Sequence, residues 1–377
     1  MRAIGNIIEV ESLAEFTALQ GQLINIAVQG LDLSKTVIDP DELTIENAWF
    51  LGCTFSSHER VSQLRAAGAM IFPGFEDLPY QPYRSSLYTV DELMEGYDPE
   101  DDQSVDRKIY DHFVHHKNAG TDIIEALAQR LHDHSIDNAL HALLEGRHDA
   151  GGRKKPVGIM GGHGTRRTDP FFNIVSRIAR QLTRDGKYVV TGGGPGIMEA
   201  GNLGAWLAPY PDEALDEALT LLAKSPHYTS PGYLDAARRV VEHFPDGAGS
   251  LAIPTWFYGH EPSNLFATDI AKYFSNSLRE DGLLAIAIYG VIYAPGSAGT
   301  LQEVFMDLCQ NHYRTFKYTS PMVFLGKEYY RDETMLYPLL QKFAEGRDYE
   351  PYLAISDDAE EIVEFIHDHP PVRLDLA

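Results

Sequence analysis

Short apolar runs alternate with longer helical patterns over the second half of the chain, and this alternation restricts the possible folds more than any other feature. The runs cover residues 157–160, 188–190, 251–253, 290–293 and 322–325. Runs this short and this continuously apolar are typical of strands buried on both faces of a parallel sheet. With helices between them, they predict an α/β domain with a doubly wound, Rossmann-like parallel sheet.

Helical periodicity fills the intervals between the predicted strands. The helices expected around the sheet cover residues 171–184, 197–207, 265–279, 301–312 and 359–367. Two further helical patterns, at 212–223 and 233–243, lie in a helical insertion at about 206–247 between consecutive strands. No internal repeat is evident anywhere in the sequence.

The first 150 residues follow a different pattern. Short apolar runs and one polar helical stretch predict a small α/β unit up to about residue 90, and two helical patterns follow at 104–116 and 121–144. The polar, glycine-rich segment 146–155 then separates two expected domains, residues 1–150 of unknown role and residues 151–377 with the doubly wound sheet. A chain of 377 residues has room for two or three such domains.

Charge and cysteine usage narrow the function classes. The formal net charge is −24, so the average surface repels nucleic acid and anionic membranes, although backbone amides can still bind a small anion. The two cysteines cannot form a disulfide framework. Glu9 and Glu11 lie where a signal peptide would need its apolar core. The longest apolar run, 283–294, is too short to span a bilayer. A cytoplasmic protein without nucleic-acid or membrane partners is expected.

Three glycine-rich turns each follow a predicted strand. The first turn covers residues 161–165 and includes Gly162, the second covers 192–196, and the third covers 295–300. Because parallel strands end at one edge of a sheet, we expect the three turns to lie at the edge where phosphates bind. Each turn taken alone is equally typical of a tight strand-to-helix connection. None matches GxGxxG or GxxxxGK[ST], so a dinucleotide or triphosphate site of the usual kind is not supported, whereas a nucleoside monophosphate remains open.

The third turn leads into a sequence with two interpretations. Thr300 and Glu303 have the spacing of a capping box, in which the glutamate folds back on the backbone amide of the threonine. The same spacing places a carboxylate one helical turn from a phosphate site, where it could act on the sugar. The sequence leaves both interpretations open.

Residues 192–200 read GGGPGIMEA, and residues 295–303 read PGSAGTLQE. These two long motifs resemble those of the LONELY GUY family of nucleoside 5′-monophosphate phosphoribohydrolases, formerly termed lysine decarboxylase-like, and of its bacterial nucleotide 5′-monophosphate nucleosidase relatives. Ser297 stands in place of a glycine of the family's PGGxGTxxE pattern. His260, Glu261 and Pro262 with Asn264 resemble an HEQxxN element. Arg279 matches an arginine-lysine element in which Glu280 replaces the lysine. The resemblance covers roughly residues 156–368.

This resemblance implies a hydrolase that cleaves the N-glycosidic bond of a nucleoside 5′-monophosphate to a free base and ribose 5-phosphate, without cofactor or metal, in a homo-oligomer. It implies that Arg279 and Glu303 form the catalytic pair and that Glu199 and Asn202 face the ribose. The residues implied at the 5′-phosphate are Gly193, Gly194, Gly196, Gly296, Gly299 and Thr300, with Ser297 in the same turn. Gly162 in the first turn and Arg166 directly after it are added as candidate phosphate contacts.

Less specific interpretations compete with several of these roles. Arg279 could be a surface arginine paired with Glu280, and Ser297 fits a positive φ less well than glycine does. Ser297 and Glu280 both depart from the family pattern. These departures also favour an alternative function, a non-catalytic nucleotide-binding, carrier or regulatory protein on the same fold. Residues 1–150 could form a regulatory or oligomer-forming module.

Two clusters of aromatic and histidine side chains are also ambiguous. The segment 256–258 could cover a base, although aromatic residues after a strand more often belong to the core. His112, His115 and His116 have helical i, i+3, i+4 spacing, but no nearby carboxylate or cysteine motif completes a metal site. A solvated helix face is the favoured interpretation of the histidines.

Overall fold

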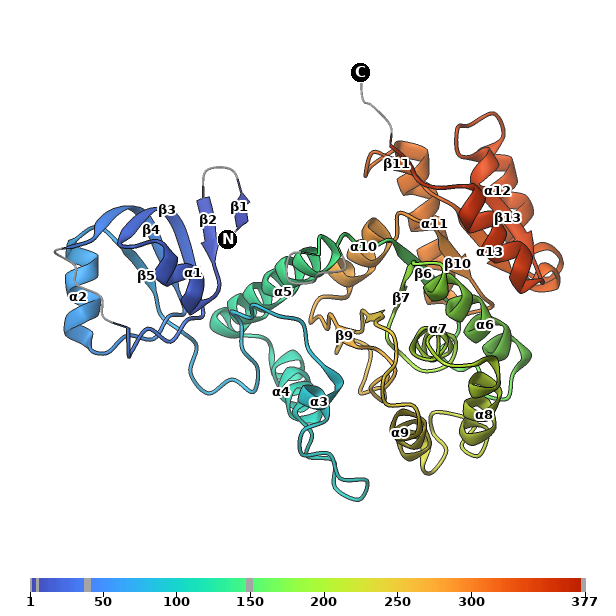
Figure 1. The fold of residues 1–377 in the computed structure, drawn as a ribbon, viewed down its shortest axis with the longest axis horizontal. Helices are drawn as coiled ribbons and strands as arrows, with labels where there is room; N and C mark the ends of the chain where they lie inside the picture. The colour runs from blue at the N-terminus through green and yellow to red at the C-terminus, as the bar shows by residue number, and fades with distance from the viewer. Residues whose placement is uncertain (1, 5–6, 37–41, 147–151, 374–377) are drawn as a thin grey trace. The chain divides into compact units, whose positions relative to one another are not determined.

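The computed structural model describes residues 2–4, 7–36, 42–146 and 152–373, which form two compact units (Figure 1). The N-terminal unit comprises Met1–Leu87 and Asp111–Leu140, and the sheet unit comprises Tyr88–Tyr110 and His141–Ala377. The expected single boundary near residue 150 differs from this division, in which residues 88–110 and 141–146 also belong to the sheet unit. The first of these segments joins that unit because the backbones of Tyr88 and Ile270 exchange two hydrogen bonds, of 3.0 and 2.9 Å.

The N-terminal unit contains a five-stranded sheet in chain order and two short helices. The first two strands are antiparallel and all the other neighbours are parallel. The elements are β1 (Arg2–Ile4), β2 (Ile7–Val10), α1 (Leu13–Ala18), β3 (Gln22–Gln29), β4 (Thr44–Leu51), α2 (His58–Ala66) and β5 (Met70–Phe72). Alternate residues of β3 and β4, such as Ile26 and Phe50, are fully buried between this sheet and its covering segments.

Strands β3 and β4 pair in parallel with a constant sequence offset. Their paired residues lie 22 positions apart in the sequence (44 − 22 = 22 at the first pair and 51 − 29 = 22 at the last). Asn25 and Asn47 both have positive φ, and the amide Nδ2 of Asn47 donates to Oδ1 of Asn25 at 2.9 Å. Over residues 22–30 and 44–52 the only identities are this asparagine and the glycines Gly30 and Gly52. The two paired strands therefore share a local backbone feature at Asn25 and Asn47 with little sequence similarity.

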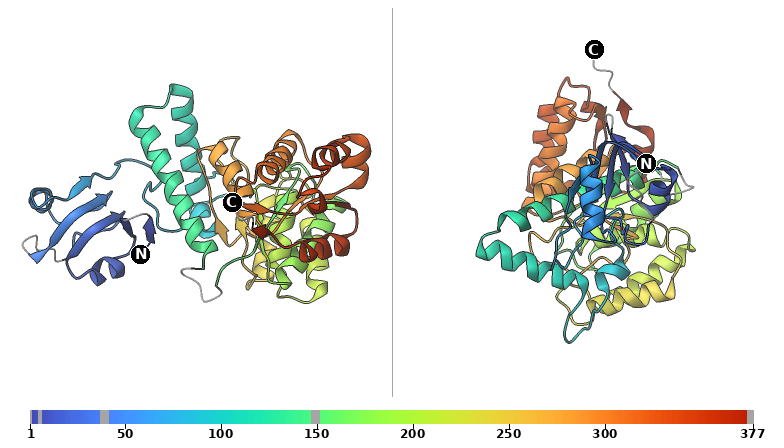
Figure 2. Two further views of the ribbon diagram at one scale, coloured as in Figure 1. Left: turned by 90° about the horizontal axis from the view of Figure 1, so that it is seen from above. Right: turned by 90° about the vertical axis from the view of Figure 1, so that its left-hand side faces the viewer.

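Two long helices lie side by side, as the teal pair in the left panel of Figure 2 shows. Helix α4 (Val105–Ala119) and helix α5 (Ile123–Leu144) match the helical patterns expected at 104–116 and 121–144, and a short helix α3 (Val90–Met94) precedes them. The side chains of His112 on α4 and Glu125 on α5 are in hydrogen-bond contact. These parts of the two helices both belong to the N-terminal unit.

The sheet unit is an α/β domain around a seven-stranded, wholly parallel sheet, which confirms the predicted fold class. The strand order is β13-β12-β10-β6-β7-β8-β9. The strands are β6 (Pro156–Met160), β7 (Tyr188–Thr191), β8 (Leu251–Ala252), β9 (Asp269–Ile270), β10 (Val291–Tyr293), β12 (Met322–Leu325) and β13 (Leu353–Ser356). The chain order reverses beside β6, and ligands of doubly wound sheets bind at such a switch point, beyond the carboxyl ends of the strands.

Helices connect these strands and cover the sheet. They are α6 (Pro170–Arg184), α7 (Ile197–Trp206), α8 (Asp212–Leu222), α9 (Tyr233–His243), α10 (Asn276–Ile286), α11 (Ala298–Tyr313), α12 (Leu336–Ala344) and α13 (Ala359–Asp368). Shorter elements are a π-helix (Glu328–Glu333), a 3-10 helix (Glu350–Tyr352) and the antiparallel pair β11 (Tyr318–Thr319) and β14 (Val372–Arg373). The helix expected at 265–279 was wrong. Its first part is strand β9, which pairs with β8, and α10 begins only at Asn276.

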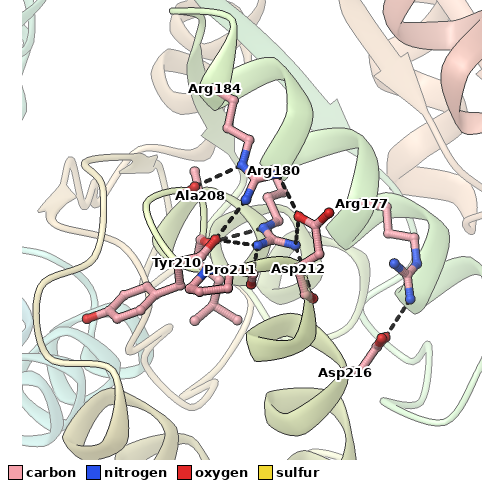
Figure 3. A network of polar contacts seen from close by, with 9 residues as sticks. Arg177, Arg180, Arg184, Ala208, Tyr210, Pro211, Asp212 and Asp216 are labelled. Atoms are coloured by element: carbon pink, nitrogen blue, oxygen red, sulfur yellow. Dashed lines mark hydrogen bonds and ion pairs between the residues drawn. The ribbon is translucent and has the colours of Figure 1, made fainter.

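Arginines on one face of α6 hold the inserted helices against the sheet domain (Figure 3). The guanidinium of Arg180 donates to the backbone carbonyl of Tyr210 at 2.6 Å, and that of Arg184 donates to the same carbonyl at 2.7 Å. Arg184 also forms an ion pair of 2.8 Å with Asp212, the first residue of α8. Cations at the carbonyl end of α7 and an acidic residue at the start of α8 both suit the helix dipoles. The insertion is therefore a fixed part of the unit.

Candidate functional site

The three glycine-rich turns meet at the carboxyl edge of adjacent strands β10, β6 and β7. The backbone N–H of Gly162 in the first turn donates to the carbonyl of Pro295 in the third turn at 3.0 Å. The carbonyl of Gly162 in turn accepts from the N–H of Ile197, just after the second turn, at 3.2 Å. The first turn therefore lies between the other two, and all three belong to one site.

The second turn is packed inside the protein. Gly193, Gly194 and Gly196 are all buried, and Gly193 and Gly196 have φ of +77° and +69°. A methyl group on Gly193 would lie 2.8 Å from the ring of Pro254, and one on Gly196 would overlap the carbonyl oxygen of Gly162. Backbone conformation and close packing therefore already favour glycine in this turn, and the phosphate contacts expected of these glycines stay a prediction.

The third turn, in contrast, presents backbone amides to open space. Ser297 is the N-cap of α11, but its hydroxyl accepts no hydrogen bond from the first helical turn, and the exposed residues Ala298 and Gly299 follow. No heavy atom lies within 4 Å of the position that a methyl group on Gly299 would occupy. A helix N-terminus whose amides lack a side-chain cap attracts an anion. The extended backbone of Ser297, with φ of −109°, removes the concern that only glycine fits there.

Thr300 and Glu303 do not form a capping box. Helix α11 begins at Ala298, so Thr300 lies inside the helix, with its side chain against Gly296. The carboxylate of Glu303 is directed elsewhere, with Oε1 at 3.6 Å from Nη1 of Arg279. Tertiary structure therefore decides between the two interpretations of this spacing, in favour of a carboxylate beside the turn.

Arg279 is a buried residue that connects the turns to Glu303. Its Nε donates to the carbonyl of Ile253, just after β8, at 2.9 Å, and its Nη2 donates to the carbonyl of Gly192 in the second turn at 3.4 Å. Only 11% of its side chain is exposed. The interpretation of Arg279 as a surface arginine was therefore wrong.

Burial raises the pKa of Glu303 to about 7, although the Arg279 guanidinium acts to lower it and the nearby Glu280 carboxylate raises it further. The Glu303 side chain is 10% exposed, so it reaches solvent only through a small opening. Titratable groups with pKa values near the working pH are typical of catalytic sites.

Glu280, which replaces the lysine of the family pattern, is a further residue of the site. It is buried, and it accepts hydrogen bonds of 2.7 Å from both Asn276 and Gln302. One of its oxygens lies 4.0 Å from Nη1 of Arg279. Arg279 therefore faces two carboxylates, those of Glu303 and Glu280, and Glu280 occupies the position of the lysine in the family pattern. The only sign of Glu280 in the sequence was that it replaces the lysine of the family pattern. That replacement did not show which way the Glu280 side chain points.

The aromatic segment 256–258 divides between core and surface. Trp256 is buried, and its indole N–H donates to Asp106 at 2.8 Å. Phe257 and Tyr258 are 43% and 64% exposed. The hydroxyl of Tyr258 accepts from the amide of Asn276 at 2.9 Å, on the helix that carries Arg279. These two exposed rings lie at the rim of the site and could contact a base.

Glu199 and Asn202, expected at the ribose, are both engaged inside the fold. Arg167 donates to both oxygens of Glu199, at 2.9 and 2.5 Å, and the Tyr233 hydroxyl donates to it at 2.7 Å. Asn202 is fully buried, and Thr191 donates to its Oδ1 at 2.6 Å. The polar atoms of both side chains are used by protein partners, which favours a structural role, and the ribose contacts implied by the resemblance stay a prediction.

The amide of Asn202 links several strands of the sheet. Its Nδ2 donates to the hydroxyl of Ser250 at 2.8 Å, and its Oδ1 also accepts from Asn264 at 2.8 Å. Asn264, part of the element resembling HEQxxN, is therefore a structural partner of Asn202. Arg166, directly after the first turn, is exposed, so its guanidinium remains a candidate phosphate contact, as does the partly exposed Gly162.

Two tyrosines of the π-helix hold the third turn in place. The hydroxyl of Tyr330 donates to the carbonyl of Ala294 at 2.7 Å, and that of Tyr329 donates to the carbonyl of Gly296 at 2.5 Å. Asp307, one turn after Glu303 on α11, accepts a hydrogen bond of 2.9 Å from Tyr293. Burial raises the pKa of Asp307 to about 7. Neither the π-helix nor Asp307 was predicted, since both depend on contacts between distant segments.

Within the described part of the chain, every helix is too short or too polar to cross a membrane. No family model matches the sequence, and neither does any curated protein. Among solved structures, the molybdenum cofactor carrier protein from Chlamydomonas reinhardtii is similar with a TM-score of 0.37 and 15% identity, covering 57% of this chain and 98% of that protein. The molybdenum cofactor binding protein from Rippkaea orientalis is similar with a TM-score of 0.35 and 17% identity, covering 57% and 97%. Similarity this low gives no information about what the present chain binds.

Proposed function

We propose that the protein hydrolyses the N-glycosidic bond of a nucleoside 5′-monophosphate, releasing a free base and ribose 5-phosphate. One observation carries this proposal. The buried Glu303 carboxylate lies 3.6 Å from the Arg279 guanidinium, on the helix whose uncapped N-terminus opens to space. An anion site and a carboxylate with a pKa of about 7 on successive turns of one helix suit a substrate with a phosphate at one end of its sugar and a scissile bond at the other.

The phosphate would bind at the third turn. The amides of Ala298 and Gly299 supply donors there, the helix dipole favours negative charge, and the Arg166 guanidinium, directly after the neighbouring first turn, can add a counter-charge. The strongly negative net charge of the chain does not prevent this, because local donors act within a Debye length of about 8–10 Å.

Glu303 and Arg279 would then divide the chemistry. Loss of the base leaves positive charge on the ribose ring, and the ionised Glu303 carboxylate stabilises that charge and orients the attacking water. The departing base gains negative charge, which Arg279 neutralises. Phe257 and Tyr258 offer exposed aromatic faces for the base.

The decisive experiment is incubation of the purified full chain with a panel of nucleoside 5′-monophosphates, followed by chromatography for free base and ribose 5-phosphate. The proposal requires release of both products from at least one nucleotide, and their loss in Glu303→Gln. Absence of base release from every nucleotide that binds would reject the hydrolase.

Nucleotide binding without base release would support the alternative function, a nucleotide-binding or carrier protein without catalysis. One observation favours it. Glu280 places a second carboxylate 4.0 Å from Arg279, and this competes with the substrate for the arginine's charge. Binding without turnover in wild type, together with turnover gained in Glu280→Lys, would identify Glu280 as the reason.

A further inference from the structure

In the described part of the chain, one group of histidine and acidic side chains gathers closely enough to hold a metal ion. An imidazole nitrogen of His112, one of His116 and a carboxylate oxygen of Glu125 all lie within 4.8 Å of one another. His112 and His116 are one turn apart on α4, and Glu125 lies in the first turn of α5. All three belong to the N-terminal unit, whereas the residues assigned to hydrolysis belong to the sheet unit.

We propose that His112, His116 and Glu125 form a binding site for a divalent transition metal ion of the zinc class. Histidines at i and i+4 on one helix face, with a carboxylate from a second segment, supply two nitrogen ligands and one oxygen ligand to zinc. A water molecule would take the fourth position.

The geometry requires only small side-chain movements. A tetrahedral zinc ion at about 2.0–2.2 Å from each ligand atom holds those atoms roughly 3.3–3.5 Å apart. Nε2 of His112 and Oε2 of Glu125 are already 3.0 Å apart, and the His112 and His116 rings are 4.4 Å apart between centroids. Binding would replace the direct contact between His112 and Glu125 by bonds from both side chains to the ion.

Neighbouring side chains fix the carboxylate in the orientation that a ligand needs. The other oxygen of Glu125, Oε1, accepts hydrogen bonds from the Tyr80 hydroxyl at 2.9 Å and from the Gln129 amide at 2.8 Å. These two donors leave Oε2 directed at His112. Such partners behind a ligand orient it and strengthen the site.

Asp122 provides a similar support for His116 and for the helix. Its Oδ1 caps α5 by accepting from the backbone N–H groups of Ile124 and Glu125, both at 2.9 Å. Its Oδ2 lies 3.9 Å from Nδ1 of His116. The cap fixes the backbone of Glu125, and the second oxygen can orient the His116 ring.

His115 provides the matched control. It lies on the same helix beside His116 and is exposed, but it does not belong to the three-residue group. The sequence pattern had grouped all three histidines and lacked a carboxylate, whereas the fold selects two of them and brings Glu125 from the next helix. A bound ion would tie α4 to α5.

The test uses the untagged full chain stripped with a chelator and titrated with Zn²⁺ by calorimetry, with Mg²⁺ as a comparison ion. Wild type and His115→Ala should bind one Zn²⁺ with equal affinity and gain thermal stability from it. His116→Ala and Glu125→Gln should each lose at least roughly tenfold in affinity. Co²⁺ should give the intense visible absorption of a tetrahedral site in wild type, and this signal should be lost in His116→Ala.

Three results would overturn the proposal: no Zn²⁺ binding by wild type, equal affinity for Mg²⁺, or a His116→Ala variant that binds as well as His115→Ala. Circular dichroism of the metal-free variants shows whether they fold. His116 is partly exposed and Glu125 is buried, so a failure of Glu125→Gln to fold would leave the His116→Ala comparison as the test.

Discussion

Nη1 of Arg279 lies 3.6 Å from Oε1 of Glu303, and both side chains are about nine-tenths buried. The arginine is held by backbone carbonyls at the ends of two strands, and the glutamate is on the helix that follows a third. Burying two charged groups costs solvation free energy, and an ion pair at this distance does not fully offset that cost. Buried titratable groups beside a specific charged partner are concentrated at functional sites.

Replacement of Glu303 by glutamine should reduce base release by at least roughly a thousandfold, about 4 kcal/mol in the activation barrier, because an amide cannot stabilise positive charge on the ribose. Nucleotide affinity, measured by calorimetry, should change little. Asp307→Asn is the matched control, since Asp307 is a buried acid on the same helix that contacts Tyr293 instead of the turn. Equal losses in the two variants would contradict a specific role for Glu303.

The rate of base release should rise with pH, and the rising limb of the pH–rate profile should have its midpoint near pH 7. Burial raises the pKa of Glu303 to about 7, and only the ionised carboxylate can act on the developing positive charge. A profile of kcat/KM between pH 5 and 9 checks this. Asp307→Asn should keep the limb. A limb near the ordinary glutamate value of 4.5 would show that the carboxylate is not desolvated as the structure indicates.

Glu303→Gln should also stabilise the fold at alkaline pH. The folded pKa of about 7 exceeds the ordinary value of 4.5, so the folded protein binds more protons than the unfolded chain between these pH values. The free energy of unfolding therefore falls as pH rises from 4.5 to 7. The gain in the variant should be on the order of 1–3 kcal/mol at pH 8 and near zero below pH 4.5. Urea unfolding of both proteins at pH 8 and pH 5.5 measures it, and a gain that does not grow with pH would contradict the expectation.

Arg167 and Glu199 should prove to be a structural pair. Arg167→Met leaves a buried carboxylate without its cation and should destabilise the sheet unit by about 3–5 kcal/mol. The double variant with Glu199→Leu should recover part of this loss in urea unfolding. A Glu199→Gln protein that stays fully stable but no longer binds nucleotide would instead support the ribose contact implied by the family resemblance.

Gly299→Ala should weaken nucleotide binding roughly tenfold, about 1.4 kcal/mol, without loss of stability. The added methyl group meets no protein atom, so it can interfere only with a ligand at the N-terminus of α11. Gly282→Ala, at a helical glycine with equally open surroundings, is the control and should bind normally. Unchanged affinity in Gly299→Ala would place the phosphate elsewhere.

The sequence alone determined the parallel sheet and the place of its turns. Apolar runs such as 157–160 and 322–325 are buried on both faces wherever the helices lie, so their character is visible locally. The glycine-rich ends of three strands must then share one edge, whatever the details of packing.

Only the tertiary structure decided which residues at that edge are available to a ligand. It buried the second turn and left the third exposed, saturated Glu199 with Arg167, and directed Glu303 to Arg279 instead of its own helix cap. It likewise brought Glu125 to two of the three neighbouring histidines. These outcomes depend on contacts between side chains far apart in the chain. Hydrophobic periodicity records only which face of an element is buried, and it carries no information about the partner that covers it.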